Sequence, residues 1–313
     1  MNRREFLGAT ITAAAAVAGS SEPILDTHIH LFDTNRPQGV PWPSRSDTIL
    51  YKPALPPRYR SIAVPLGVRG AIAIECSPWR ADNRWLLDVA RIDAIVAGVI
   101  GNLEPADVRF GKQLDELRQN PLFRGIRYGN LWDRSLTQSL NNPNFVDGMK
   151  RLGNAGLTLD TANPDAPLLS AIVRLTDAVP NLRVVLDHLP RLEMPVDAAS
   201  RAHCEEDLRQ LAGRPQVFVK VSGVLRRMDG RVPEKAAVYK HTLDELWERF
   251  GADRLMYGSD WPNSDLWAPY PVELNVVKAY FDSKGKVAAE KYFWKNSIAA
   301  YRWMPRDAAQ KAV

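Results

Sequence analysis

From residue 23 onward, the chain alternates between short apolar runs and longer segments whose apolar residues recur at helical spacing. Apolar runs of this length, rich in β-branched residues, predict strands that are buried on both faces. Eight strands are expected, at Ile24–His28, Gly70–Glu75, Ile95–Ile100, Arg124–Arg127, Leu157–Asp160, Arg183–Asp187, Val217–Val221 and Arg254–Gly258. The segments between them predict helices, at Asn83–Arg91, Val108–Gln119, Phe145–Asn154, Leu168–Ala178, Cys204–Ala212, Thr242–Phe250 and Ala288–Tyr301.

This alternation is typical of βα units, in which helices connect parallel strands. Eight such units favour an α/β fold of the (β/α)8 TIM barrel type, formed as a single domain by residues 21–313. A doubly wound sheet is the alternative. It is disfavoured because no glycine-rich phosphate turn follows the first predicted strand.

The first twenty residues predict a targeting segment and not a part of the fold. Asn2–Gly8 resembles the twin-arginine export motif, and a mild apolar stretch with a small-residue end follows it. We therefore expect export of the folded protein, to the periplasm. A frayed N-terminal helix is the alternative. The apolar stretch is too short to cross a bilayer, and no later segment approaches the required length.

The composition is that of an ordinary globular protein, with 45% hydrophobic and 25% charged residues. The net charge of +5 comes from dispersed lysines and arginines, so a nucleic-acid partner is not expected, whereas a small-molecule substrate is. The two cysteines, Cys76 and Cys204, cannot form a disulfide framework. Whether they pair is left open, as is the oligomeric state.

Ionisable residues are concentrated where the predicted strands end. Active sites of (β/α)8 barrels lie at the carboxyl ends of the strands. These positions carry His28, His30, Glu75, Arg124, Arg127, Asp160, His188, Lys220, Ser222 and Asp260. A barrel would bring them together at one mouth, although the pattern does not show whether Lys220 and Ser222 point inward.

Three of the five histidines belong to this set. His28 and His30 are two residues apart, so on a strand they face the same side, and paired imidazoles suit a divalent cation such as zinc. With His188 and Asp260 they form a nitrogen and oxygen ligand set with room for water. Asp260 is also placed to take a proton from water, although an N-cap is an alternative reading. Glu75 is a further ligand or the partner of an arginine.

Substrate binding is expected from Arg124, Arg127 and Asp160. Guanidinium groups suit carboxylates and oxyanions. Because the two arginines are three positions apart, they need not share a face, and Arg127 is the stronger candidate for the pocket. Asp160 would bind substrate hydroxyls or orient an arginine.

Two aromatic loops are expected near the mouth. The segment 32–69 contains many prolines, which exclude a long regular helix. We interpret it as a wall or lid whose Trp42 and Tyr51 line the pocket; an excursion along the side of the barrel is the alternative. Trp261, which follows Asp260, is also expected to contact the substrate.

The motifs together resemble a known family. His28-Ile29-His30, Asp187-His188-Leu189 and Gly258-Ser259-Asp260-Trp261-Pro262 resemble the amidohydrolase superfamily. Arg124-Gly125-Ile126-Arg127 and Val219-Lys220-Val221-Ser222-Gly223 are similar to its amidohydrolase-related (amidohydrolase 2) branch. That branch includes fuconolactonase-like sugar lactonases and 2-pyrone-4,6-dicarboxylate lactonase. The resemblance spans nearly the whole chain after the predicted signal.

The resemblance implies a (β/α)8 barrel that hydrolyses an ester-like or amide-like bond with an activated water. It implies that His28, His30 and His188 are metal ligands and that Asp260 is both ligand and general base. Members with two metals carry a lysine on the fourth strand and a histidine on the fifth. This chain has Arg124, Arg127 and Asp160 there, so we expect one divalent ion, zinc by preference, with its occupancy left open.

Our hypothesis is hydrolysis of a small sugar-acid or carboxylated lactone. Asp260 would take the proton from water, and Arg127 would stabilise the oxyanion. His188 would orient the water or protonate the leaving oxygen. The alternatives are a decarboxylase or amidase on the same scaffold, or an exported binding protein without catalysis.

Overall fold

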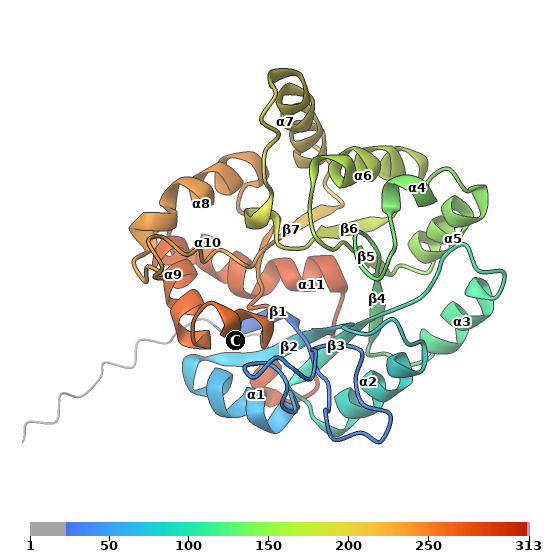
Figure 1. Cartoon of the computed structure of the whole chain (residues 1–313), viewed down its shortest axis with the longest axis horizontal. Coiled ribbons are helices and arrows are strands. Elements are labelled where there is room, and N and C mark those ends of the chain that lie inside the picture. Colours follow the sequence, from blue (N-terminus) through green and yellow to red (C-terminus); the bar gives the residue numbers. More distant parts are fainter. Residues whose placement is uncertain (1–22, 312–313) are drawn as a thin grey trace, which may run out of the picture.

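Eight parallel strands form one barrel in the computed structural model, which describes residues 23–311 (Figure 1). The strands follow chain order and are β1 (Ile24–Ile29), β2 (Val68–Ile74), β3 (Val96–Gly101), β4 (Phe123–Arg127), β5 (Thr158–Asp160), β6 (Arg183–Leu186), β7 (Val217–Val221) and β8 (Leu255–Tyr257). The predicted single-domain (β/α)8 barrel is confirmed.

Helices surround this barrel (Figure 1). They are α1 (Pro56–Ala63), α2 (Ala81–Ile92), α3 (Phe110–Leu117), α4 (Leu136–Ser139), α5 (Pro143–Asn154), α6 (Ala166–Ala178), α7 (Ala198–Ala212), α8 (Ala236–Phe250), α9 (Tyr270–Ser283), α10 (Lys286–Glu290) and α11 (Asn296–Tyr301). The remaining elements are the short 3-10 helices η1 (Val64–Leu66), η2 (Leu189–Arg191), η3 (Asn263–Leu266) and η5 (Ala308–Gln310) and the π-helix η4 (Lys291–Lys295). The predicted helix at Ala288–Tyr301 is α10, η4 and α11 in succession, whereas α1, α4 and α9 were not predicted.

The strands are almost entirely buried because helices cover their outer face and side chains fill their inner face. The barrel closes between β1 and the end of β8. There the His30 N–H donates to the Trp261 carbonyl at 2.7 Å, and the Asp260 N–H donates to the His28 carbonyl at 2.8 Å. The hydrogen bonds that close the barrel therefore lie beside the predicted site residues.

The barrel interior has an apolar part below its polar mouth. Leu25 packs there with Ile72 and Met256, and Tyr301 and Trp303 from the C-terminal segment cover the same cluster. A register shift between Asp26 and Ile29 interrupts the regular alternation of β1. This shift allows Leu25 to join the apolar interior while His28, three residues later, reaches the polar mouth.

Several expectations concern parts of the chain outside the barrel strands. The predicted twin-arginine segment lies within residues 1–22, outside the described residues, and stays a prediction. Within residues 23–311 no helix has the length and apolar character needed to span a membrane. Cys76 and Cys204 are both free thiols.

Candidate active site

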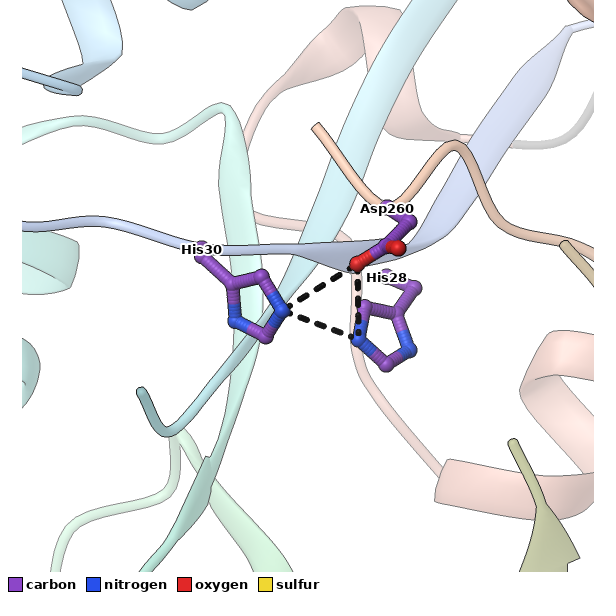
Figure 2. Close-up of side chains that lie close together, drawn as sticks. All are labelled: His28, His30 and Asp260. Atoms are coloured by element: carbon purple, nitrogen blue, oxygen red, sulfur yellow. Dashed lines mark hydrogen bonds and ion pairs between the residues drawn. The ribbon is translucent and has the colours of Figure 1, made fainter. Parts of the chain in front are cut away.

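Three histidines and one aspartate meet at the mouth of the barrel. His30 Nε2 and His28 Nε2 lie 3.3 Å and 3.7 Å from Asp260 Oδ1 and 3.3 Å from each other. Figure 2 shows these three side chains converging from β1 and from the segment after β8. His188 Nε2 approaches the same oxygen at 3.8 Å. The structure therefore brings four predicted site residues together.

The backbone places two of these residues in an uncommon conformation. His188 (φ 55°) and Asp260 (φ 58°) both adopt left-handed backbone geometry directly after their strands. A residue with a side chain rarely adopts this geometry, which costs about 1–3 kcal/mol. Such backbone strain persists where the surrounding structure holds it in place, and it is concentrated at functional sites.

The two carboxylate oxygens of Asp260 have different hydrogen-bond partners. Oδ2 accepts hydrogen bonds from Arg191 Nη2 at 3.1 Å and from Asn263 Nδ2 at 2.9 Å. Oδ1 is buried and has no hydrogen-bond partner in the described structure, although it faces the imidazoles. Burial alone would raise the pKa of Asp260, but His188, His30 and Arg191 hold it well below its usual value. Asp260 is therefore an ionised carboxylate with one free acceptor.

The imidazoles are held by contacts on their outer nitrogens. His30 Nδ1 lies 3.1 Å from the Ile74 carbonyl oxygen, and His188 Nδ1 lies 2.7 Å from Ser222 Oγ. A carbonyl can only accept, so His30 donates to it from Nδ1, and this contact holds the ring with Nε2 toward Asp260. Burial lowers the pKa of both His28 and His188 well below the usual value.

This arrangement has the chemistry of a metal-binding group. Ligand atoms of His28, His30 and Asp260 lie within 4.8 Å of one another, as do those of His28, Asp187 and His188. Neutral imidazole nitrogens and carboxylate oxygens are the ligands that zinc takes in catalytic sites. Asp260 Oδ1, which has no hydrogen-bond partner, is the atom of this carboxylate that would coordinate such an ion. The residues therefore fit one divalent cation.

A buried ion-pair network lies beside these donors. Lys220 Nζ is 2.6 Å from Asp160 Oδ2, 3.0 Å from Asp187 Oδ1 and 3.3 Å from His28 Nδ1. The Tyr301 hydroxyl also donates to Asp160 at 2.7 Å. Burial raises the pKa of Asp160 to about 6 although Lys220 opposes this shift. The orientation that the sequence left open is thus resolved, because Lys220 and Ser222 both point into the barrel.

Asp160 does not face a substrate pocket as predicted. Its side chain is fully buried, because the ammonium of Lys220 and the hydroxyl of Tyr301 cover it. Arg127 does reach the cluster, where its Nε lies 3.2 Å from Asp187 Oδ2. Arg127 thus remains a candidate to contact substrate, whereas Asp160 holds Lys220.

Glu75 lies at the mouth of the barrel. Among residues 23–311 it belongs to neither of the two groups that could hold a metal ion. Trp132 Nε1 donates to Glu75 Oε2 at 3.1 Å, and the Ser77 N–H donates to the same oxygen at 3.1 Å. Burial raises the pKa of Glu75, and the charge of Arg127 opposes the shift. The structure therefore favours a hydrogen-bonded carboxyl near Arg127 over a ligand.

Three predicted substrate contacts do not bring their side chains to the cluster. Arg124 is the second residue of β4 and Arg127 the last, so they are separated by about 10 Å along the strand. Trp261 is fully buried against Tyr59, with ring centroids 5.2 Å apart, and does not line an open surface. Tyr51 is partly buried in the proline-rich loop and takes no part in the described polar contacts of the cluster. Trp42 does approach, with its ring centroid 5.7 Å from that of His30.

Asp187, Arg191 and Asn263 were not predicted as site residues. Asp187 ends the sixth predicted strand and directly precedes His188, so its position was a signal that could have identified it. Arg191 ends η2, and Asn263 begins η3. Their contacts with Asp260 depend on how these turns fold, and no strand pattern marks them.

Glu273 of α9 is a buried carboxyl behind the site, and it leads to a pH prediction. It accepts the Val224 N–H at 3.0 Å, and burial raises its pKa from 4.5 to about 8. The folded state therefore holds this proton more tightly than the unfolded chain. Its contribution to the unfolding free energy should fall between about pH 5 and pH 8, by at most about 1.4 kcal/mol per pH unit.

Chemical denaturation across this range tests the effect. Glu273→Gln keeps an acceptor oxygen but cannot ionise, so its unfolding free energy should lack this slope and exceed that of the wild type at pH 8. Glu248→Gln, an exposed position on α8, is the matched control and should follow the wild type. Parallel pH curves for wild type and Glu273→Gln would contradict the assignment.

Comparisons with known proteins agree with this architecture. L-fucono-1,5-lactonase from Burkholderia ambifaria is 28% identical over 249 residues, covering 77% of this chain and 81% of the relative. L-fucono-1,5-lactonase from Burkholderia multivorans is 27% identical over 292 residues, covering 91% and 97%. A crystal structure of a Burkholderia multivorans amidohydrolase with bound zinc superposes with a TM-score of 0.76 at 22% identity, covering 90% of this chain and all of that one.

The family assignment rests on a match along almost the whole barrel. The amidohydrolase family model matches residues 25–303, from the first strand to the segment after α11. This range contains every residue of the His28, His30, His188 and Asp260 cluster. The chain therefore belongs to the amidohydrolase family and is a hydrolase, as its motifs predicted.

Proposed function

We propose that this chain hydrolyses a small lactone, with Asp260 as the base that activates water. The observation that carries the proposal is the free, buried oxygen of an ionised Asp260, which faces three imidazoles at the barrel mouth. A base in this position can accept a proton from a water held among the rings. The two lactonases among the relatives support the choice of substrate class.

The reaction balances with the groups present. The water oxygen attacks the lactone carbonyl carbon while its proton passes to Asp260 Oδ1. The ring C–O bond then breaks, the leaving oxygen takes the proton back from Asp260 Oδ1, and a hydroxy acid is released. His188, held by Ser222, orients the water, and Arg127 stabilises the negative charge that develops on the carbonyl oxygen.

A divalent ion would be held by His28, His30 and Asp260. When bound, such an ion polarises a carbonyl and lowers the pKa of a coordinated water. The donor chemistry of these residues supports zinc as the ion, and the zinc-bound amidohydrolase structure shares the fold.

An aromatic wall lies beside His30. Trp42 packs edge-on against His30, with ring planes 71° apart, and also contacts Phe32. A small pocket of about 20 Å³ beside it is lined by Trp42, Glu75 and Trp79 among other residues. Arg127, which reaches the cluster, suits a carboxylate or a carbonyl oxygen of the substrate.

A hydrolysis screen tests the proposal. The purified protein is mixed with L-fucono-1,5-lactone, other sugar-acid lactones and carboxylated aromatic lactones in a weakly buffered pH-indicator assay, with and without chelator. We expect acid release from at least one lactone well above the spontaneous rate. Release of carbon dioxide, or hydrolysis of amides in place of lactones, would assign the alternative reactions.

Metal binding gives a separate prediction. We expect the protein to bind about one zinc ion per chain, and His30→Ala to weaken this binding at least about 10-fold, because one of the donors is lost. Competition with a chromogenic chelator and metal analysis after dialysis measure the affinity. His203→Ala removes an exposed histidine of α7 and should leave zinc binding unchanged. Equal affinities of His30→Ala and wild type would exclude His30 as a ligand.

A further inference from the structure

A large groove lies between α2 and α3, and none of the residues in the His28, His30, His188 and Asp260 cluster lines it. It encloses about 990 Å³, within the range of small-molecule sites. Side chains of α2, α3 and β4 line it, together with the segment 304–306. The groove is therefore separate from the candidate active site and large enough for a metabolite.

Arg124, which the sequence had placed in the active site, lies in this groove. Its side chain passes over Gly98, where an added Cβ would come within 2.9 Å of Arg124 Cγ. Its Nε is buried without a hydrogen-bond partner, and the guanidinium forms no ion pair among residues 23–311. Burial lowers the pKa of Arg124, with no nearby carboxylate to offset it. A half-buried guanidinium without an ion pair, whose Nε is fully buried and unpartnered, calls for an anionic partner.

The rim of the groove carries further positive charge. Arg84 and Arg91 of α2 are exposed and, like Arg124, form no ion pair in the described part of the chain. Two acids, Asp88 and Glu116, also line the groove, and Glu116 is 3.9 Å from Lys112. The unpaired arginines therefore outnumber the acids that face them.

The two other arginines of the groove are already engaged. Arg80 lies 3.3 Å from Asp107, and Arg306 donates to the carbonyls of Asp93 and Val96 at 2.9 Å and 2.8 Å. Arg80 and Arg306 therefore already have partners in the protein, whereas Arg84, Arg91 and Arg124 keep donors for a ligand.

We propose that this groove is a binding site for a small organic anion with two or more carboxylate or phosphate groups. Arg124 on the floor would bind one anionic group, and Arg84 or Arg91 on the rim would bind another. Guanidinium groups bind both carboxylate and phosphate through paired, charge-assisted hydrogen bonds. Two anionic groups are needed because the acids on the rim repel a ligand that engages only one arginine.

Titration calorimetry at low ionic strength tests the proposal with citrate and inorganic phosphate as probes and acetate as the monovalent comparison. We expect saturable binding of citrate but no saturable binding of inorganic phosphate or acetate, each of which carries one anionic group, and Arg124→Gln should weaken citrate binding at least about 10-fold. Arg118→Gln is the matched control, since Arg118 is an exposed arginine outside the groove that pairs with Asp115 at 2.8 Å. It should bind citrate as the wild type does.

Lactone hydrolysis should be unchanged in Arg124→Gln, which separates this groove from the active site. If that variant fails to fold, Arg84→Gln/Arg91→Gln supplies the same comparison from exposed positions. Absence of saturable citrate binding, or equal binding by wild type and Arg124→Gln, would overturn the proposal. Loss of binding in Arg118→Gln as well would show a nonspecific charge effect and would also overturn it.

Discussion

Replacing Asp260 with asparagine is expected to lower kcat for lactone hydrolysis by about 10²–10⁴-fold while leaving the protein folded. The amide has nearly the same shape, and its oxygen can still accept from Arg191 or Asn263 on the Oδ2 side. It cannot take a proton from water at the position of Oδ1, which is the oxygen left without a partner. Steady-state kinetics on the best lactone and circular dichroism measure the two expectations.

A second variant in the same segment controls for disturbance of the loop. Asp265→Asn makes the same chemical change in η3, where Asp265 pairs with Arg58 at 3.0 Å. It should retain most of the wild-type kcat. Near-wild-type turnover in Asp260→Asn would remove Asp260 from the role of base, whereas an equal loss in both variants would point to the loop and not to the carboxylate.

The fold and the central cluster could be predicted because both depend on position along strands. Alternation of apolar runs with helical patterns indicated the barrel, and the barrel requires strand ends to meet. His28, His30, His188 and Asp260 lie at or just beyond such ends, so their meeting did not depend on details of the loops.

The expectations that the structure corrected depend on where a residue lies along its strand and on how the segments after the strands fold. Arg124 and Arg127 were both expected to bind substrate, with Arg127 as the stronger candidate, but only Arg127 lies at the carboxyl end of β4. Asp160 ends β5, yet Tyr301 reaches it from α11, a contact 141 positions away in sequence that no local pattern reveals. Arg191 depends in the same way on the turn η2, which directly follows the left-handed His188.

Lys220 gives the largest expected effect on stability. Its ammonium is fully buried between Asp160 and Asp187, at 2.6 Å and 3.0 Å. Lys220→Met keeps most of the side-chain volume but leaves two buried carboxylates without this cation. Breaking a buried ion pair by removing one partner costs about 3–5 kcal/mol, so we expect a loss of this size in the unfolding free energy at pH 8, measured by chemical denaturation. Lys278→Met removes an exposed lysine that pairs with Asp282 and should cost no more than about 1 kcal/mol.

The size of the loss should depend on pH and on Asp160. Burial already raises the pKa of Asp160 to about 6 with Lys220 present, and removing the cation would raise it further. Below that pKa the carboxyl takes up a proton and no longer needs a counter-ion, so Lys220→Met should be less damaging at pH 5 than at pH 8. The double variant Lys220→Met/Asp160→Asn should recover part of the loss at pH 8, since the amide can still accept from Tyr301. A pH-independent loss with no recovery would assign the effect to packing and not to the buried charges.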